Sequence, residues 1–237
     1  MNREYHKWYS EALGREMELL VHGHGGTPVL VFPTSQGKYF EYEDRGMTEA
    51  LRGKLESGSL QLFCVDSVDS ESWYNKSVHP RVRVARHMQY EYYVLKEVIP
   101  FIKQKNGNGA VVTTGCSFGA YHAMNIALRH PRLVSKCITM GGAFDIKQFL
   151  DGYYDDDCYF HSPQDYMQNM ADGEFLAAFR SNFYLLLTGE HDMCWDKNES
   201  FARLLRAKGV PHHLYVWGDR TGHDWPWWQR MAQVYLP

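Results

Sequence analysis

The sequence predicts an α/β fold in which a mostly parallel central sheet carries helices on both faces. Continuous apolar runs, typical of strands buried on both sides, recur along the chain and alternate with segments of helical spacing. Ahead of them, two runs within residues 4–22 flank residues 12–14, and the second run partly alternates, which predicts an antiparallel hairpin at one edge of the sheet. At 237 residues, the chain fits one domain spanning residues 1–237.

The remaining elements follow from the same patterns. Buried strands are expected at residues 28–33, 60–66, 110–114, 133–142, 182–189 and 211–217, and helices up to about 54 and over 81–103, 118–130, 197–208 and from 225 onward. Pro100 is expected to kink or tighten the last turn of the helix over 81–103. Residues 146–182 are the least regular part and are interpreted as a lid-like insertion.

Composition narrows the range of partners and compartments. The formal net charge of −3 does not favour binding to nucleic acid or to an anionic membrane, and no apolar run approaches the length of a membrane span. The first residues lack the apolar segment of a signal peptide. Five scattered cysteines without a Cys-x-x-Cys pair indicate free thiols in a reducing, cytoplasmic location. The oligomeric state has no signature in the sequence.

The clearest motif is Gly-x-Ser-x-Gly at residues 115–119, which follows an apolar β-branched run and leads into a helical pattern. A strand, a sharp turn and a helix in this order form a nucleophile elbow, which holds the central Ser117 above the sheet. The amides that begin the helix face any negative charge formed there. Cys116 is the alternative nucleophile, but its place beside the centre of the motif predicts a small buried side chain.

A serine nucleophile needs a base, and the base needs a carboxylate that fixes its tautomer. Asp192 and His223 each come just after a predicted strand, so we expect them to meet Ser117 at the carboxyl edge of the sheet. Glu190 is the competing acid, although Asp192 lies further past its strand. The other candidates are interpreted as exposed, packed or capping residues: His122, His191, His212, His213 and Asp224.

The tetrahedral intermediate of acyl transfer needs two N–H donors for its oxyanion. Phe118, directly after the nucleophile, is expected to supply one. The loop after strand 28–33 is expected to supply the other, from Ser35 first and Gln36 next. Three aromatic residues on loops near this edge either line the substrate pocket or pack beneath it: Trp73, Tyr74 and Tyr153.

Two further groups of side chains have the residue types of a metal site. His22 and His24 have no nearby acidic or cysteine partner, and the consecutive aspartates 155–157 cannot readily converge on one ion. Both segments are interpreted as loops, and neither a metal nor a cofactor is predicted.

Five motifs spread over nearly the whole chain resemble those of the α/β-hydrolase superfamily, in particular an esterase group that includes esterase D-type and mycolyltransferase-like enzymes. The motifs lie at residues 31–37, 71–75, 115–119, 188–192 and 222–228. The order nucleophile, acid, base is also that of the superfamily. The resemblance implies an α/β-hydrolase fold and hydrolysis of small-molecule carboxylic esters by Ser117, Asp192 and His223.

The chain departs from the longer lipases of this superfamily, because it has no His-Gly-Gly-Gly oxyanion motif and no large lid domain. This difference favours small or medium acyl groups over long-chain lipids. The same three residues would also serve a thioesterase or an acyltransferase. An alternative of another class is a non-catalytic binding protein on a hydrolase scaffold.

Overall fold

The computed structural model describes residues 1–237 and contains one sheet of eight strands in the order β1-β2-β4-β3-β5-β6-β7-β8. The strands are β1 (Arg3–Ser10), β2 (Arg15–His22), β3 (Thr27–Phe32), β4 (Leu60–Val65), β5 (Val111–Cys116), β6 (Val134–Met140), β7 (Phe183–His191) and β8 (His212–Gly222). The pairs β1/β2 and β2/β4 are antiparallel, and every other pair is parallel. The predicted fold class, with its hairpin at one edge, is confirmed.

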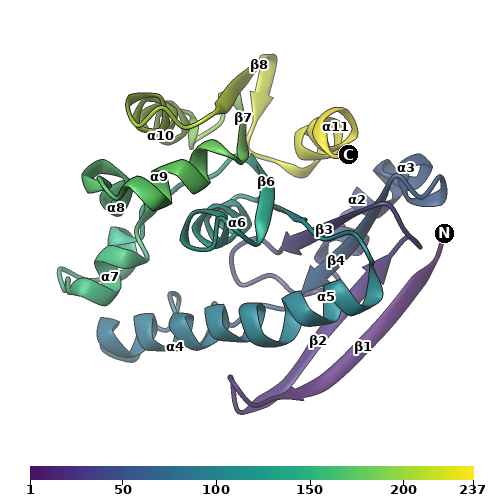
Figure 1. The fold of residues 1–237 in the computed structure, drawn as a ribbon, viewed down its shortest axis with the longest axis horizontal. Helices are drawn as coiled ribbons and strands as arrows, with labels where there is room; N and C mark the ends of the chain where they lie inside the picture. Colours follow the sequence, from purple (N-terminus) through teal and green to yellow (C-terminus); the bar gives the residue numbers. More distant parts are fainter.

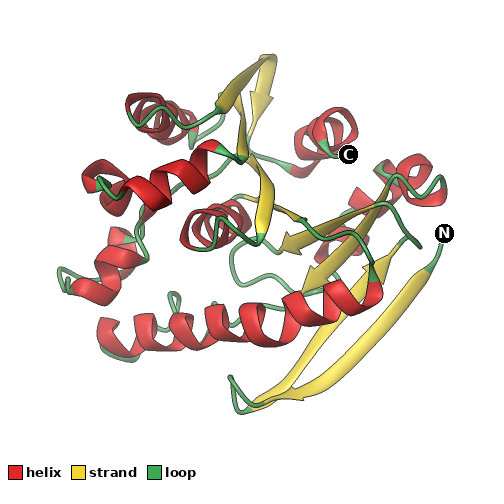
Figure 2. Ribbon diagram, in the orientation of Figure 1, coloured by secondary structure: helices red, strands yellow, loops and turns green.

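Helices cover both faces of the sheet and make a three-layer molecule (Figures 1 and 2). They are α1 (Glu41–Asp44), α2 (Met47–Ala50), α3 (Arg52–Glu56), α4 (Pro80–Tyr93), α5 (Ile99–Lys105), α6 (Phe118–Arg129), α7 (Asp156–Phe160), α8 (Pro163–Asn169), α9 (Gly173–Arg180), α10 (Trp195–Ala207) and α11 (Trp225–Tyr235). One apolar core packs α4, α5, α6, α8, α9 and α10 against the sheet. The opposite core packs α1, α2, α3 and α11 against it.

The amino-acid pattern explains which strands lie at the centre. Strands β4 and β5 are buried at every position, as continuous apolar runs require in a strand covered on both faces. Strand β1 instead alternates between exposed and partly buried residues and forms the edge of the sheet. Its Trp8 indole N–H and Ser10 hydroxyl donate to Glu97 at 2.8 Å, which fastens the hairpin to the long helix on that face.

The helix expected over residues 81–103 is interrupted by a π-helical turn, η1 (Val94–Val98), between α4 and α5. Pro100 has no N–H to donate to the carbonyl of Lys96, and the backbone widens in the turn that precedes it. The irregularity that Pro100 predicts therefore falls before this residue and not in the last turn of the helix.

Three other segments differ from the sequence-based expectation. The helical stretch before residue 54 consists of the short helices α1, α2 and α3, because Gly46 adopts a left-handed φ of 69° between the first two. Strand β8 continues to Gly222 through residues expected to form a loop. Residues 146–182 contain a 3₁₀ turn, η2 (Lys147–Phe149), followed by α7, α8 and α9.

The chain has no helix with the length and apolar character needed to cross a membrane.

We predict that Gly119→Ala destabilises the fold by 2 kcal/mol or more, on the order of the cost of severe core strain. A Cβ at Gly119 would lie 2.4 Å from the carbonyl oxygen of Phe32 and 2.5 Å from that of Pro33, and backbone atoms cannot move aside easily. Chemical denaturation measures the change.

Gly53→Ala in α3 is the matched control, because a Cβ there meets no atom within 4 Å. This variant should gain about 0.5–1 kcal/mol from helix propensity. Equal stability of the two alanine variants would contradict the close approach of α6 to β3.

Candidate active site

The turn between β5 and α6 places Ser117 in a backbone conformation of φ 54° and ψ −120°. This left-handed region is rare for a residue with a side chain, and such residues are held in place by their surroundings. The Ser117 N–H donates to the carbonyl of Met140 at 2.8 Å, which ties the turn to the end of β6. Gly115 also allows the turn, because a Cβ there would lie 2.3 Å from the backbone of Gly119.

Ser117, His223 and Asp192 form a continuous chain of hydrogen bonds at the carboxyl edge of the sheet. His223 Nε2 lies 2.9 Å from Ser117 Oγ, and His223 Nδ1 lies 2.8 Å from Asp192 Oδ1. The Asp192 carboxylate is buried, with 1% of its side chain exposed, and Asp192 Oδ1 also accepts the Cys194 N–H at 2.8 Å. The three residues that the sequence singles out are therefore brought together.

Two neighbours define the position of the His223 ring. Gly141 lies against it, because a Cβ at Gly141 would be 2.8 Å from both His223 Nδ1 and Asp192 Oδ2. The Trp228 ring packs edge-on at a centroid distance of 4.9 Å. Gly141 has a φ of 61°, so both its conformation and its surroundings favour glycine.

The competing side chains lie elsewhere. The Glu190 side chain is 45% exposed, and Oε1 accepts the backbone N–H of Arg220 at 2.6 Å. His191 is also exposed, and its Nε2 lies 3.7 Å from Glu190. His212 accompanies the start of β8, at the opposite end of that strand from His223. Among these carboxylates, Asp192 is the one that contacts His223.

The loop after β3 presents one free amide. The Thr34 N–H donates to Glu41 at 2.8 Å, and the Gly37 N–H donates to the Thr34 carbonyl at 2.8 Å. The Gln36 N–H donates to Asp69 Oδ2 at 3.3 Å. Among residues 34–37, only the Ser35 N–H makes no hydrogen bond within the protein. This pattern favours Ser35 over Gln36 as an oxyanion donor.

The second expected donor is the Phe118 N–H, the first amide of α6. The first amides of a helix have no intrahelical acceptor and are available to an anion. Cys116, the residue before Ser117, is fully buried, and burial raises the pKa of its thiol. Its neutral thiol points to Tyr42, whose hydroxyl lies 3.7 Å away, so Cys116 is a packed residue.

The three aromatic residues expected near the pocket have different positions. Trp73 is fully buried and lies in a core cluster beneath the elbow, so its side chain offers no surface to a substrate in this structure. The Tyr74 ring packs edge-on against Phe118 at 5.6 Å, and its hydroxyl donates to Ser35 Oγ at 2.7 Å. Tyr153 packs against His79 at 4.8 Å and donates to Asp155.

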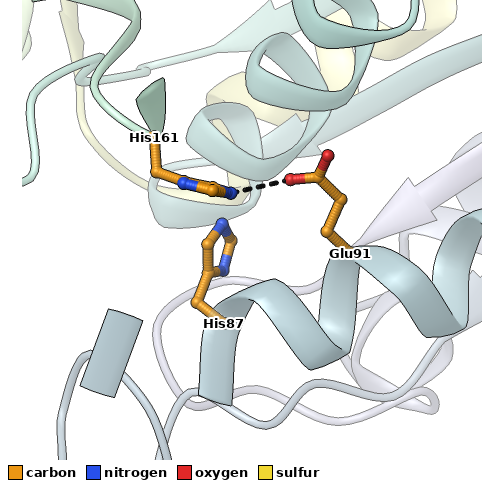
Figure 3. Close-up of side chains that lie close together, drawn as sticks. All are labelled: His87, Glu91 and His161. Atoms are coloured by element: carbon orange, nitrogen blue, oxygen red, sulfur yellow. Dashed lines mark hydrogen bonds and ion pairs between the residues drawn. The ribbon is translucent and has the colours of Figure 1, made fainter. Parts of the chain in front are cut away.

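A buried cluster of metal-ligand residue types, which the sequence analysis missed, consists of His87, Glu91 and His161 (Figure 3). The signal was the spacing of His87 and Glu91, which places both side chains on one face of α4. His161 reaches the cluster from the end of α7, and its Nε2 lies 2.9 Å from Glu91 Oε2. Burial, together with neighbouring His161 and His122, lowers the pKa of His87 well below its usual value.

Both oxygens of the Glu91 carboxylate already contact other side chains. Arg129 Nε donates to both Glu91 oxygens at 2.9 Å, and His130 Nε2 lies 2.5 Å from Oε1. Burial raises the pKa of Glu91, but hydrogen bonds from His130 and His161 and the charge of Arg129 outweigh it and lower the pKa well below the usual range. A divalent cation would have to share this carboxylate with a guanidinium, so we interpret the cluster as an ion-pair network.

Comparison with known proteins agrees with the fold. A family model described as alpha/beta hydrolase fold matches residues 71–218, which is more than half of the chain. The chain therefore belongs to the α/β-hydrolase family. No curated protein matches the sequence.

Several solved structures share the fold over nearly the whole chain. A ferulic acid esterase has a TM-score of 0.80 and 18% identity, with 100% of this chain and 96% of that chain covered. An S-formylglutathione hydrolase from Agrobacterium tumefaciens has a TM-score of 0.77 and 17% identity, covering 99% and 92%. A CE1 ferulic acid esterase from Anaeromyces mucronatus, in complex with ferulic acid, has a TM-score of 0.72 and 12% identity, covering 99% and 89%.

At these identities the likeness establishes the fold. These neighbours are named as an esterase and an S-formylglutathione hydrolase. Enzymes of both kinds fall in the esterase group whose motifs the sequence resembles.

We predict that Ser117 reacts with a fluorophosphonate and that Gly141→Ala slows this reaction by about 10- to 100-fold, because a displaced His223, the expected base, disrupts a near-attack geometry. The added methyl would press on both His223 and Asp192. Gly222→Ala is the matched control, since a Cβ at this neighbour of His223 meets nothing within 4 Å. Equal labelling rates for both variants would contradict the placement of Gly141.

We also predict that Glu91→Gln lowers the free energy of unfolding at neutral pH by about 2 kcal/mol, because it removes the charged acceptor that the partly exposed Arg129 and the histidines His130 and His161 share. The folded pKa of Glu91 is depressed, so its contribution is present above the unfolded pKa of about 4.3 and is lost as the pH falls below that value.

The variant should therefore show a weaker loss of stability between neutral and acidic pH than the parent protein. Denaturation curves at a series of pH values measure this slope. Glu49→Gln, at an exposed helical ion pair with Arg52, should leave the slope unchanged. A parallel slope for Glu91→Gln and the parent would overturn the interpretation.

Proposed function

We propose that this protein is a serine hydrolase that cleaves carboxylic esters of small or medium acyl groups through an acyl-enzyme on Ser117. The observation that carries the proposal is the uninterrupted relay from Ser117 Oγ through His223 to Asp192, at 2.9 and 2.8 Å. A neutral serine hydroxyl is a weak nucleophile, and this arrangement of base and carboxylate activates it.

In the first half of the reaction, His223 Nε2 accepts the Ser117 hydroxyl proton while Oγ attacks the ester carbonyl carbon. Asp192 holds the proton on His223 Nδ1 and stabilises the imidazolium that forms. The carbonyl oxygen becomes an oxyanion that accepts hydrogen bonds from the Ser35 and Phe118 amides. When the tetrahedral intermediate collapses, the bond to the alcohol oxygen breaks and His223 Nε2 gives its proton to the leaving alcohol.

In the second half, water takes the place of the alcohol. His223 accepts a proton from the water as the water oxygen attacks the acyl carbon, and the same two amides stabilise the second oxyanion. Collapse breaks the bond to Ser117 Oγ, which recovers its proton from His223. The products are a carboxylic acid and free enzyme.

One partly exposed aromatic side chain, Tyr74, would border the acyl group. Tyr74 lies between Phe118 and Ser35, and burial raises the pKa of Tyr74, so its hydroxyl stays protonated and donates to Ser35 Oγ. Phe149, from the insertion 146–182, packs against Phe118 at 5.1 Å and Tyr74 at 4.9 Å. Phe149 is itself buried, so these contacts anchor the insertion to the elbow helix and to Tyr74.

The proposal predicts that Ser117→Ala abolishes turnover of p-nitrophenyl acetate, because no other group can form the acyl-enzyme. Asp192→Asn should lower kcat by about 10⁴-fold, since it favours the wrong tautomer of His223. Glu190→Gln is the matched control at the competing carboxylate and should retain activity. Steady-state kinetics on purified protein measure all three variants, and full turnover by Ser117→Ala would rule out the mechanism.

A further inference from the structure

A second buried pair of carboxylate and imidazole lies behind the loop that carries the free Ser35 amide. Asp69 Oδ1 lies 2.9 Å from His122 Nε2, and each side chain is 1% exposed. Asp69 follows β4 and His122 lies on α6, so the pair joins two segments that are far apart in sequence. Neither residue contacts Ser117, His223 or Asp192 in the hydrogen-bond relay.

The other Asp69 oxygen accepts the Gln36 N–H at 3.3 Å. Gln36 is exposed and has a φ of 57°, a left-handed conformation that costs a non-glycine residue about 1–3 kcal/mol unless its surroundings hold it. The Asp69 backbone carbonyl also accepts the Tyr74 N–H at 2.9 Å. Asp69 thus fixes both the loop that bears Ser35 and the tyrosine whose hydroxyl bonds to Ser35.

His122 contacts both sides of the expected oxyanion site. Its ring stacks on Phe32, at the end of β3, at 5.8 Å and packs edge-on against Phe118 at 5.0 Å. Tyr90 packs edge-on against it from α4 at 5.5 Å. These contacts leave the imidazole little freedom to turn, so Asp69 is held firmly in the direction of Gln36.

We infer that Asp69, held by His122, is a positioning residue that orients the Ser35 N–H toward the substrate carbonyl oxygen at Ser117. The inference rests on the proposed function. Because the Gln36 N–H is taken by a buried carboxylate, the peptide that precedes it cannot rotate freely, and the neighbouring Ser35 amide keeps its direction before substrate binds. A fixed donor stabilises the oxyanion without reorganisation at the moment of reaction.

The test compares Asp69→Leu and Asp69→Asn with the parent protein. Leucine removes the acceptor for Gln36, and kcat for p-nitrophenyl acetate should fall by about 10- to 100-fold, somewhat less than when a donor is deleted outright. KM should change by less than about 2-fold, because the donor acts on the transition state. Asparagine keeps a neutral oxygen that can accept from Gln36, so its kcat should lie between those of Asp69→Leu and the parent.

A trifluoromethyl ketone, which forms a tetrahedral adduct bearing an oxyanion, provides a second readout. Its inhibition constant should rise by the same factor by which kcat falls, variant by variant. A purely structural role would lower the unfolding midpoint but leave kcat and the inhibition constant of the folded enzyme unchanged. Glu91→Gln is the control for a purely structural role and should change only the unfolding midpoint. Glu91 is also a buried carboxylate paired with a histidine, but it lies in the network of Figure 3.

The outcomes separate the two proposals. Parental kcat and inhibition constant in Asp69→Leu would overturn the positioning role and leave the proposed function intact. If Asp69→Leu does not fold, Asp69→Ala decides the question, because it also removes the acceptor for the Gln36 N–H, and a parental kcat in that variant has the same meaning. No ester turnover and no fluorophosphonate labelling of Ser117 in the parent protein would overturn both proposals.

Discussion

The backbone turn at Ser117 is the constraint on which the rest of this edge of the sheet depends. A φ of 54° is unfavourable for serine, and it persists because Gly115 and Gly119 allow α6 to approach β5 and β3 within a distance that excludes a Cβ. The same approach brings the loop after β3 beside the first amide of α6. The strained turn therefore sets the direction of the proposed nucleophile and also brings together the two segments that carry its oxyanion donors.

Strand register places the other two members of the relay. Strands β6, β7 and β8 run parallel, and Gly189 and His191 pair with Trp217 and Gly222 across an irregularity between them. Between these two pairs β8 has more residues than β7, yet both strands end at the pair of His191 and Gly222, so the residues that follow, Asp192 and His223, lie side by side. Gly141, at the end of β6, leaves the room that the two side chains need. Parallel strands thus gather residues that are distant in sequence at one carboxyl edge.

The sequence was sufficient for the order of the strands along the chain, for the turn at Ser117 and for the positions of Asp192 and His223 just after strands, because each follows from local patterns of apolar spacing, glycine and strand ends. It ranked Ser35 ahead of Gln36 as the oxyanion donor but could not give the structural reason, since this depends on which amide a distant carboxylate, Asp69, occupies. Trp73 looked like a loop residue at the rim, yet it is fully buried, because the long connection before α4 folds back on the elbow helix. Contacts between segments that are distant in sequence leave no periodic pattern of apolar residues.

Three buried carboxylates in this molecule are each paired with a histidine, and the third partner of each pair distinguishes their roles. His161 and Glu91 share their site with Arg129, whose charge makes the group an ion pair. His122 and Asp69 face a backbone amide, and both side chains are 1% exposed, so no substrate can reach that imidazole. His223 and Asp192 face a hydroxyl, and 17% of the His223 side chain is exposed. A general base must exchange protons with a substrate and with water, so among these three imidazoles only His223 has both the partner and the access that acyl transfer requires.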